Sequence, residues 1–329
     1  MLAKIPLSFR IHPCIDMVSS MVDPKIDKLI SMPEGFATSL VAAAFADRQE
    51  NDGALTELKA GRVYCAGSSA HGAIGVAAGG PGGETGDPRL VLSLLKDEVV
   101  QVSCGWRHTV FVGKGGQVWS CGDGVNGKHG QGHTEVVAVP RLVEGLRDIR
   151  IVQVGCGQHH SGFISAEGSL YTCGMGLYGQ LGHAGALRDE PSPRRVEKVL
   201  ELSTVACGDL HTIVLRRDGR AMAFGYAANG RLGLEVDPTA QERLVAERPA
   251  LLGVHAPLAQ ASEGVVVASV SAGGSHSVII YSDGSAYTCG SGEFGQLGHG
   301  GRQDEARPRH VTTLGSHRVR RASCGAMHT

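Results

Sequence analysis

The sequence lacks several features that would point to common classes of protein. It has no Cys-x-x-Cys pair and no Asn-x-Ser/Thr sequon, and its nine cysteines are odd in number. This pattern favours reduced thiols in an intracellular protein over a disulfide framework. No apolar run approaches the roughly 18 residues that cross a bilayer, so we expect no membrane insertion. The segment Met1–Arg10 lacks the unbroken apolar core of a secretory signal. We expect a cytoplasmic protein, with the nucleus, the mitochondrion and the cilium as alternatives.

Net charge is also nearly absent. The 329 residues contain 31 Lys+Arg and 32 Asp+Glu, which leaves a formal net charge of −1. This balance does not favour broad electrostatic contact with nucleic acid or with a membrane surface. Glycine, in contrast, is abundant at 48 residues and indicates a fold with many tight turns.

A repeat with a period of about 51 residues runs through most of the chain. Each copy starts with a motif close to Cys-Gly-x-x-His-Thr, whose histidines are His108, His160, His211, His276 and His328. A β-hairpin signature follows, in which two short apolar runs flank a Gly turn, as at Glu167-Gly168. A Gly-x-x-Gly turn comes next, in a weaker version at Gly127-Lys-His-Gly130, and then a Pro that opens another strand, as at Pro193. A further strand, such as Ile151–Val154, leads into the next copy.

Four short strands per repeat at this period are typical of one blade of a β-propeller. We therefore predict an all-β propeller of four-stranded blades after an N-terminal extension, residues 1–34. The propeller domain covers 35–329, with apolar residues that form cores between neighbouring blades. The predicted blades are five complete ones and the start of a sixth, at about 35–104, 105–156, 157–207, 208–272, 273–324 and, in part, 325–329.

The repeated combination of Cys-Gly-x-x-His-Thr, Gly-Gln-Leu-Gly and the following Pro resembles the regulator of chromosome condensation repeat family, over roughly residues 35–329. The resemblance implies a seven-bladed ring, of which this chain would form part. The family's founding member exchanges nucleotide on a nuclear small GTPase and sits on nucleosomes, partly through basic extensions that this sequence lacks. A plant ultraviolet photoreceptor in the family depends on clustered Trp, whereas this chain has only Trp106 and Trp119.

Several motifs that suggest cofactor or metal chemistry are better explained by the repeat. Three stretches match the dinucleotide fingerprint Gly-x-Gly-x-x-Gly, but no helical pattern follows them. They start at Gly122, Gly174 and Gly290. Cys and His share one spacing in four repeats, but pairs distributed around a ring do not converge on one tetrahedral site. We therefore predict no cofactor and no metal site, and assign the repeated His a structural role with its ring nitrogens bonded to backbone or to a Thr hydroxyl.

Catalytic residues are not expected either. His71, His133, His183 and His299 lie near the Gly-x-x-Gly turns without an adjacent nucleophile or Asp signature, and we interpret them as surface loop histidines. A short basic cluster, Arg318, Arg320 and Arg321, is interpreted as a partly solvated strand edge. The chain is therefore predicted not to be an enzyme, with no catalytic, cofactor-binding or metal-binding residues.

Insertions distinguish the first and fourth repeats from the others, and deviations of this kind carry individual function in repeat folds. They fall within residues 42–60, in the Gly-rich stretch Gly79–Gly86, and within Glu235–Arg248 and His255–Gly264. The leading hypothesis is a non-catalytic interaction scaffold or regulatory propeller that binds protein partners through these insertions and loop faces. The alternative is that these insertions are tolerated surface loops that bind no partner. The alternative function is guanine-nucleotide exchange on a small GTPase, and a third is regulation of a larger polypeptide or assembly.

Overall fold

The computed structural model describes residues 63–68, 71–76, 84–184, 187–197, 199–234, 245–251 and 264–329. Within these residues the strands form a two-stranded sheet, β1 (Tyr64–Ser68) with β2 (Glu84–Leu90), and four antiparallel sheets of four strands. Within each sheet every strand pairs with the next one along the chain, as expected when hairpin turns join short strands. The chain therefore folds as a series of small meanders.

The four full sheets share one strand order and nearly one strand length. The first contains β3 (Val99–Cys104), β4 (His108–Gly113), β5 (Val118–Gly122) and β6 (Val137–Leu142). The second contains β7 (Ile151–Cys156), β8 (His160–Ser165), β9 (Leu170–Gly174) and β10 (Glu190–Arg195). The third contains β11 (Leu202–Cys207), β12 (His211–Arg216), β13 (Ala221–Tyr226) and β14 (Val245–Leu251). The fourth contains β15 (Val267–Ala272), β16 (His276–Tyr281), β17 (Ala286–Gly290) and β18 (Glu305–His310).

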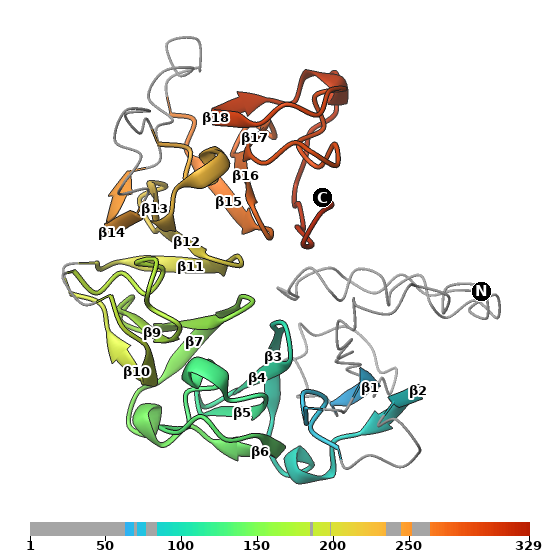
Figure 1. The fold of residues 1–329 in the computed structure, drawn as a ribbon, viewed down its shortest axis with the longest axis vertical. Coiled ribbons are helices and arrows are strands. Elements are labelled where there is room, and N and C mark those ends of the chain that lie inside the picture. Colours follow the sequence, from blue (N-terminus) through green and yellow to red (C-terminus); the bar gives the residue numbers. More distant parts are fainter. Residues whose placement is uncertain are drawn as a thin grey trace, which may run out of the picture.

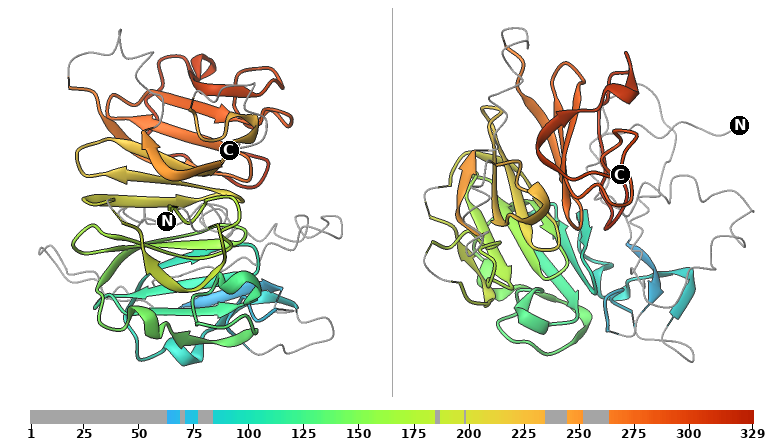
Figure 2. Two further views of the ribbon diagram at one scale, coloured as in Figure 1. Left: turned by 60° about the vertical axis from the view of Figure 1, so that its left-hand side comes forward. Right: turned by 45° about the horizontal axis from the view of Figure 1, so that its top comes forward.

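The sheets are arranged around a common centre, with the first strand of each sheet innermost and the fourth outermost (Figure 1). The innermost strands contact one another in sequence, β3 with β7, β7 with β11 and β11 with β15. Figure 2 shows the same sheets from other directions, stacked face to face. This arrangement confirms the predicted all-β propeller, in which each sheet covers a face of its neighbour.

Hydrophobic cores fill the spaces between neighbouring sheets, as predicted. One core joins Val110 and Val112 of β4 to Val154, Phe163 and Cys173 of the second sheet. The next cores repeat this arrangement between the second and third sheets and between the third and fourth. Because the apolar strand faces of neighbouring sheets are buried against each other, contacts between successive repeats form the core of the fold.

The sheets begin one strand earlier than the repeats predicted from the sequence. Strand β7, which the sequence analysis placed at the end of the repeat 105–156, pairs with β8 and is the innermost strand of the next sheet. The reason is local, because the Cys-Gly-x-x-His motif is itself a tight turn. The Gly157 amide donates to the His160 carbonyl oxygen at 2.9 Å, which closes the β7–β8 connection. The chain passes from one sheet to the next after the outer strand instead, through 3₁₀ turns such as η4 (Glu144–Leu146).

Most of the predicted insertions, and the N-terminal extension, lie outside the described residues. Two corrections concern their edges. Residues 84–86, predicted as part of a Gly-rich loop, belong to strand β2, and 245–248, predicted as inserted sequence, belong to β14. Strand β14 contains Pro249, the counterpart of the Pro in the outer strands of the other sheets. No helix in the described part of the chain is long and apolar enough to cross a membrane.

Candidate functional site

Strand direction places two sets of loops on one side of the molecule. Strands alternate in direction within a sheet, so the connection from first to second strand and the one from third to fourth emerge at the same end. We call the surface formed by these connections the loop face. Its described residues are 105–107, 123–136, 157–159, 175–184, 187–189, 208–210, 227–234, 273–275 and 291–304. The hairpin turns between second and third strands lie on the opposite face.

A ladder of buried histidines links the sheets just beneath the loop face. In four of the five repeat histidines the ring Nε2 atom lies next to a Ser or Thr hydroxyl of the following sheet or, at Thr329, of the next repeat. The pairs are His108–Ser161 at 2.7 Å, His160–Thr212 at 2.7 Å, His211–Ser277 at 3.0 Å and His276–Thr329 at 2.9 Å. The predicted hydrogen bond is therefore found for Nε2 of these four rings but not for their Nδ1 atoms, and the fifth histidine, His328, is exposed.

Hydrogen bonding assigns the tautomer of these rings. The Thr212 hydroxyl donates to the Gln180 carbonyl oxygen at 2.8 Å, so His160 Nε2 must carry the proton and donate to the hydroxyl. The Nδ1 atom of each of the four rings is buried without a hydrogen-bond partner. Protonation there is unfavourable, and burial lowers the pKa of His160 to about 3 and that of His276 to about 4. The ladder histidines are therefore neutral and hold the loop face from below.

Two Asn–Asp bonds tie neighbouring blades at the loop face itself. Asn126 donates to the Asp189 carboxylate at 2.6 Å, and Asn229 donates to Asp304 at 2.8 Å. Both Asn residues adopt left-handed backbone conformations, with φ of 63° and 61°, which Asn tolerates better than most residues. Asp189 also accepts from the Gly176 amide at 3.2 Å, so its carboxylate is held by both blades.

The first full sheet departs most from the repeat on this face. Where the second sheet has Met175 and Gln180, it has Asp123 and Lys128, which form an ion pair at 2.7 Å with the Lys128 side chain only 1% exposed. Burial would raise the pKa of Asp123, but hydrogen bonds from Lys128 and the Val125 amide outweigh it and hold that pKa below its usual value. Burial lowers the pKa of Lys128, while the Asp123 carboxylate opposes that change.

Trp106 covers this ion pair and is partly exposed. The Arg107 guanidinium carbon lies 4.1 Å from the centre of the Trp106 ring, and the Lys128 ammonium nitrogen lies 5.8 Å from it. The His159 ring approaches edge-on, 5.6 Å between ring centres. We call Trp106, Arg107, Asp123, Lys128 and His159 the Trp106 cluster. Trp106 and the Gly127-Lys-His-Gly130 turn were named separately in the sequence analysis. Both depart from the repeat, and this shared departure could have indicated that they belong to one site.

A second aromatic group lies on the same face between the second and third sheets. The Tyr178 and Tyr226 rings are 5.1 Å apart, and the Arg231 guanidinium lies 5.1 Å from the centre of the Tyr226 ring. Large apolar side chains are exposed on the loops around both groups, at Val125, Val136, Leu177, Leu187 and Phe294. The loop face therefore presents aromatic, aliphatic and Arg side chains on a rigid support.

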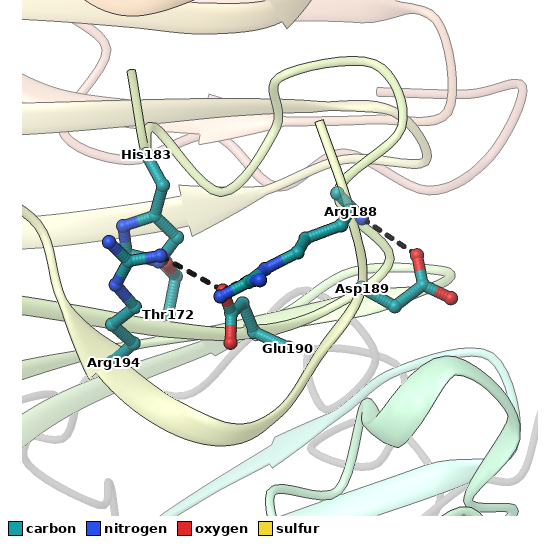
Figure 3. Close-up of polar contacts among 7 residues, drawn as sticks. Thr172, His183, Arg188, Asp189, Glu190 and Arg194 are labelled. Atoms are coloured by element: carbon teal, nitrogen blue, oxygen red, sulfur yellow. Dashed lines mark hydrogen bonds and ion pairs between the residues drawn. The ribbon is translucent and has the colours of Figure 1, made fainter. Parts of the chain in front are cut away.

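The loop histidines considered as catalytic candidates in the sequence analysis differ in their contacts and burial. His183 is buried, not on the surface as predicted, and its Nε2 lies 3.0 Å from the Thr172 hydroxyl; His299 and Thr288 repeat this contact at 2.9 Å. Nearby, Glu190 accepts hydrogen bonds from Arg188 and Arg194 (Figure 3). His133 packs edge-on against His129, with 5.2 Å between ring centres, and His71 is partly buried.

Within the described residues, no group of three or more His, Cys, Asp or Glu side chains is placed to hold a metal ion. Two predictions about individual residues can be checked. Arg318, Arg320 and Arg321 are exposed as predicted, but they lie in a segment without strand structure and not on a strand edge. At the Gly122–Gly127 match to the dinucleotide fingerprint, the chain forms a 3₁₀ turn, η3 (Val125–Gly127), before β6, so the structural reading of that motif is confirmed.

Comparison with known proteins gives consistent matches. A family model described as the RCC1-like domain matches residues 41–329. The E3 ubiquitin-protein ligase HERC2 of Homo sapiens is 32% identical over 275 residues, 82% of this chain and 5% of that protein. The ultraviolet-B receptor UVR8 of Arabidopsis thaliana is 31% identical over 244 residues, 74% of this chain and 52% of UVR8. The crystal structure of human WBSCR16 aligns with a TM-score of 0.70 and 26% identity, covering 80% of this chain and 65% of that one. The chain thus spans less than two thirds of each of these relatives.

Proposed function

The chain belongs to the RCC1-like domain family, and we propose that it is a non-catalytic interaction propeller that binds a protein partner through the loop face. The observation that carries the proposal is the Trp106 cluster. Trp and Arg dominate the small sets of residues that supply most of the binding energy in protein interfaces. Trp106 and Arg107 lie together, partly exposed, on loops held by the histidine ladder.

Rigidity supports this choice of surface. The Trp106 amide donates to the Gly157 carbonyl oxygen of the next sheet, and the Asp123 amide donates to the Arg107 carbonyl oxygen at 2.7 Å. A loop held in this way loses little conformational freedom on binding, so more of the contact energy appears as affinity. The exposed apolar residues around the cluster would exclude water from the contact.

Reaction chemistry is not part of the proposal. Within the Trp106 cluster, Asp123 is already paired with Lys128, and the ladder histidines beneath it are bonded to hydroxyls. The ligase activity in the name of HERC2 belongs to a protein of which this chain spans 5%. Nucleotide exchange on a small GTPase, the alternative from the sequence, is not favoured by any described feature, and a nucleotide-release assay across a GTPase panel tests it directly.

A quantitative pull-down tests the proposal. The wild-type chain, a Trp106→Ala variant and a Val152→Ala variant are compared by mass spectrometry of the captured proteins. Val152 is an exposed apolar residue near the opposite end of strand β7 and serves as the control. We expect Trp106→Ala to lose at least one partner about tenfold or more while Val152→Ala retains it. Identical partner sets for all three proteins would refute the loop face as the binding surface.

The insertion in the first repeat can be tested in parallel. Deletion of residues 42–58 asks whether that segment adds a second contact to the partner captured by the loop face. If a partner is lost from the deletion variant but retained by Trp106→Ala, the insertion binds it and the loop face does not. A partner lost in both variants would place the two elements in one interface.

A further inference from the structure

We propose that the partner presents a carboxylate to Arg107, so that the loop face binds an acidic segment of another protein. This inference rests on the proposed function and adds the chemistry of the partner. It comes from the charge state of the Trp106 cluster, in which one cation has no counter-ion while the neighbouring charges are paired.

Arg107 is the unpaired cation. No ion pair to its guanidinium occurs among the described residues. Three carboxylates belong to the same part of the loop face, Asp123, Glu135 and Asp189. Asp123 accepts from Lys128 and from the Val125 amide, and Asp189 accepts from Asn126 and the Gly176 amide. Glu135 is exposed and forms no ion pair with Arg107, so no carboxylate of the described residues is bonded to this guanidinium.

The Arg107 backbone is held in an unusual conformation. Its φ is 121°, whereas its counterparts in the other described repeats, His159, Leu210, Ser275 and Met327, do not have positive φ. Such a conformation is unfavourable for a residue with a side chain and persists only where surrounding contacts enforce it. The hydrogen bond from the Asp123 amide to the Arg107 carbonyl oxygen recurs at His159, Leu210 and Ser275, so the positive φ is particular to Arg107 and not a property of the turn. The Arg107 guanidinium lies over the Trp106 ring.

Its contact with the indole leaves the guanidinium suited to one kind of ligand. The guanidinium carbon lies over the Trp106 ring, 4.1 Å from the ring centre, which restricts the side chain while its N–H groups remain donors. A planar pair of N–H donors matches the two oxygens of a carboxylate. A pre-positioned Arg loses less freedom on binding than a free one, which favours this residue as the anchor.

The test uses a defined probe. A phage-displayed library of random 12-residue peptides is selected on the full chain, and the selected peptides are synthesised with each Asp or Glu and with the matching Asn or Gln. Binding is measured by fluorescence polarisation to the wild type, Arg107→Gln, Trp106→Ala and a control, Arg220→Gln. Arg220 is exposed beside the β12–β13 hairpin turn, on the opposite face.

We expect selected peptides to share a carboxylate whose amide version binds the wild type about ten- to a hundredfold more weakly. Arg107→Gln should weaken the acidic peptide by a similar factor and no longer distinguish it from its amide version. Arg220→Gln should leave both affinities unchanged. Thermal unfolding of each variant, monitored by circular dichroism, establishes that the comparison is made on folded protein.

Other outcomes separate the two proposals. If Trp106→Ala abolishes binding while Arg107→Gln changes it less than about threefold, the interaction face stands and the carboxylate inference falls. If neither substitution affects any selected peptide, or if no peptide is selected, both fall. If the wild type forms a dimer that Arg107→Gln dissociates, the acidic group belongs to a second copy of this chain, and the inference of a different protein partner is overturned.

Discussion

Replacing His160 by Gln should flatten the dependence of the free energy of unfolding on pH below 6.5. In the folded protein the His160 ring is buried, donates from Nε2 to Thr212, and has no acceptor at Nδ1. Its folded pKa, about 3, lies below the ordinary 6.5 that applies when the chain is unfolded. The unfolded state therefore binds a proton at His160 at pH values where the folded state does not. As pH falls below 6.5, this difference lowers the free energy of unfolding.

The magnitude follows from the gap between the two pKa values. Each pH unit below 6.5 costs about 1.4 kcal/mol per histidine until the folded pKa is reached. At pH 5 the loss is about 2 kcal/mol for His160 and is insensitive to whether its folded pKa is 3 or 4, because both lie well below 5. His108 and His211 have pKa values well below 6.5, again because of burial, and His276 is lowered to about 4. His160 and His276 together lose about 4 kcal/mol at pH 5, a large share of the whole stability of a typical domain.

Urea unfolding at a series of pH values from 7.5 to 5 measures this loss. His160→Gln keeps a donor near the Thr212 hydroxyl but removes the titrating ring, so its stability curve should approach or cross the wild-type curve as pH falls. Thr212→Ser is the matched control, because Ser occupies the equivalent positions 161 and 277 and preserves both hydrogen bonds. It should retain the wild-type slope.

The result that refutes this reasoning is specific. If His160→Gln and the wild type lose stability in parallel between pH 6.5 and 5, within about 0.5 kcal/mol, the ring is not held neutral by burial. A loss of the slope in Thr212→Ser as well would show that the hydrogen-bond geometry, not the titration of the ring, controls the acid response.

Three further predictions concern the same scaffold. Thr212→Val keeps the shape but leaves His160 Nε2 and the Gln180 carbonyl oxygen unbonded, and should destabilise the chain by about 2–4 kcal/mol in urea unfolding at pH 7.5; a change below about 0.5 kcal/mol would contradict the ladder. Gly174→Ala should be severely destabilising, because φ is 112° and the added Cβ would lie 2.6 Å from the His160 Cα. Gly295→Ala, where φ is 79° and no atom is close, should destabilise the chain by only about 1–2 kcal/mol. Equal shifts of the melting temperature in the two variants would reject the steric argument. The double variant Asp123→Met, Lys128→Gln introduces the residues of the second sheet and should leave the free energy of unfolding unchanged or higher. Lys128→Gln alone should lower it by about 3–5 kcal/mol, because the Asp123 carboxylate is left buried without its partner. Thermal melting of both variants measures the difference.

The sequence predicted the architecture because the propeller repeats its signals. Hairpin Gly positions such as Gly168 and Gly219 adopt the positive φ that the turns required, and the apolar strands pack between sheets as expected. The sequence did not show which four strands form one sheet. A linear repeat has no intrinsic start, and only the pairing of β7 with β8 shows that Cys-Gly-x-x-His closes a hairpin within one sheet.

The candidate site was less predictable because it depends on contacts between repeats. Trp106 and Lys128 are 22 positions apart, and His159 belongs to the next blade, yet they meet at one point of the loop face. The sequence marked Gly127-Lys-His-Gly130 as a weak turn without indicating that Lys128 pairs with Asp123. The missing information was which deviations share a blade surface, and that follows from the ring arrangement.

The Asp123–Lys128 pair is a place where folding and function make different demands. A buried ion pair gains little over neutral residues of similar size, because removing two charges from water offsets most of their attraction. The second sheet places Met175 and Gln180 in the same frame, and that sheet packs as well as the first. Stability therefore does not account for the pair. Its position does: the Lys128 ammonium lies near the Trp106 ring and is paired with Asp123, which leaves Arg107 as the cation of the cluster without a counter-ion among the described residues. If the double substitution folds normally but loses the partner that Trp106→Ala also loses, the pair is maintained for binding.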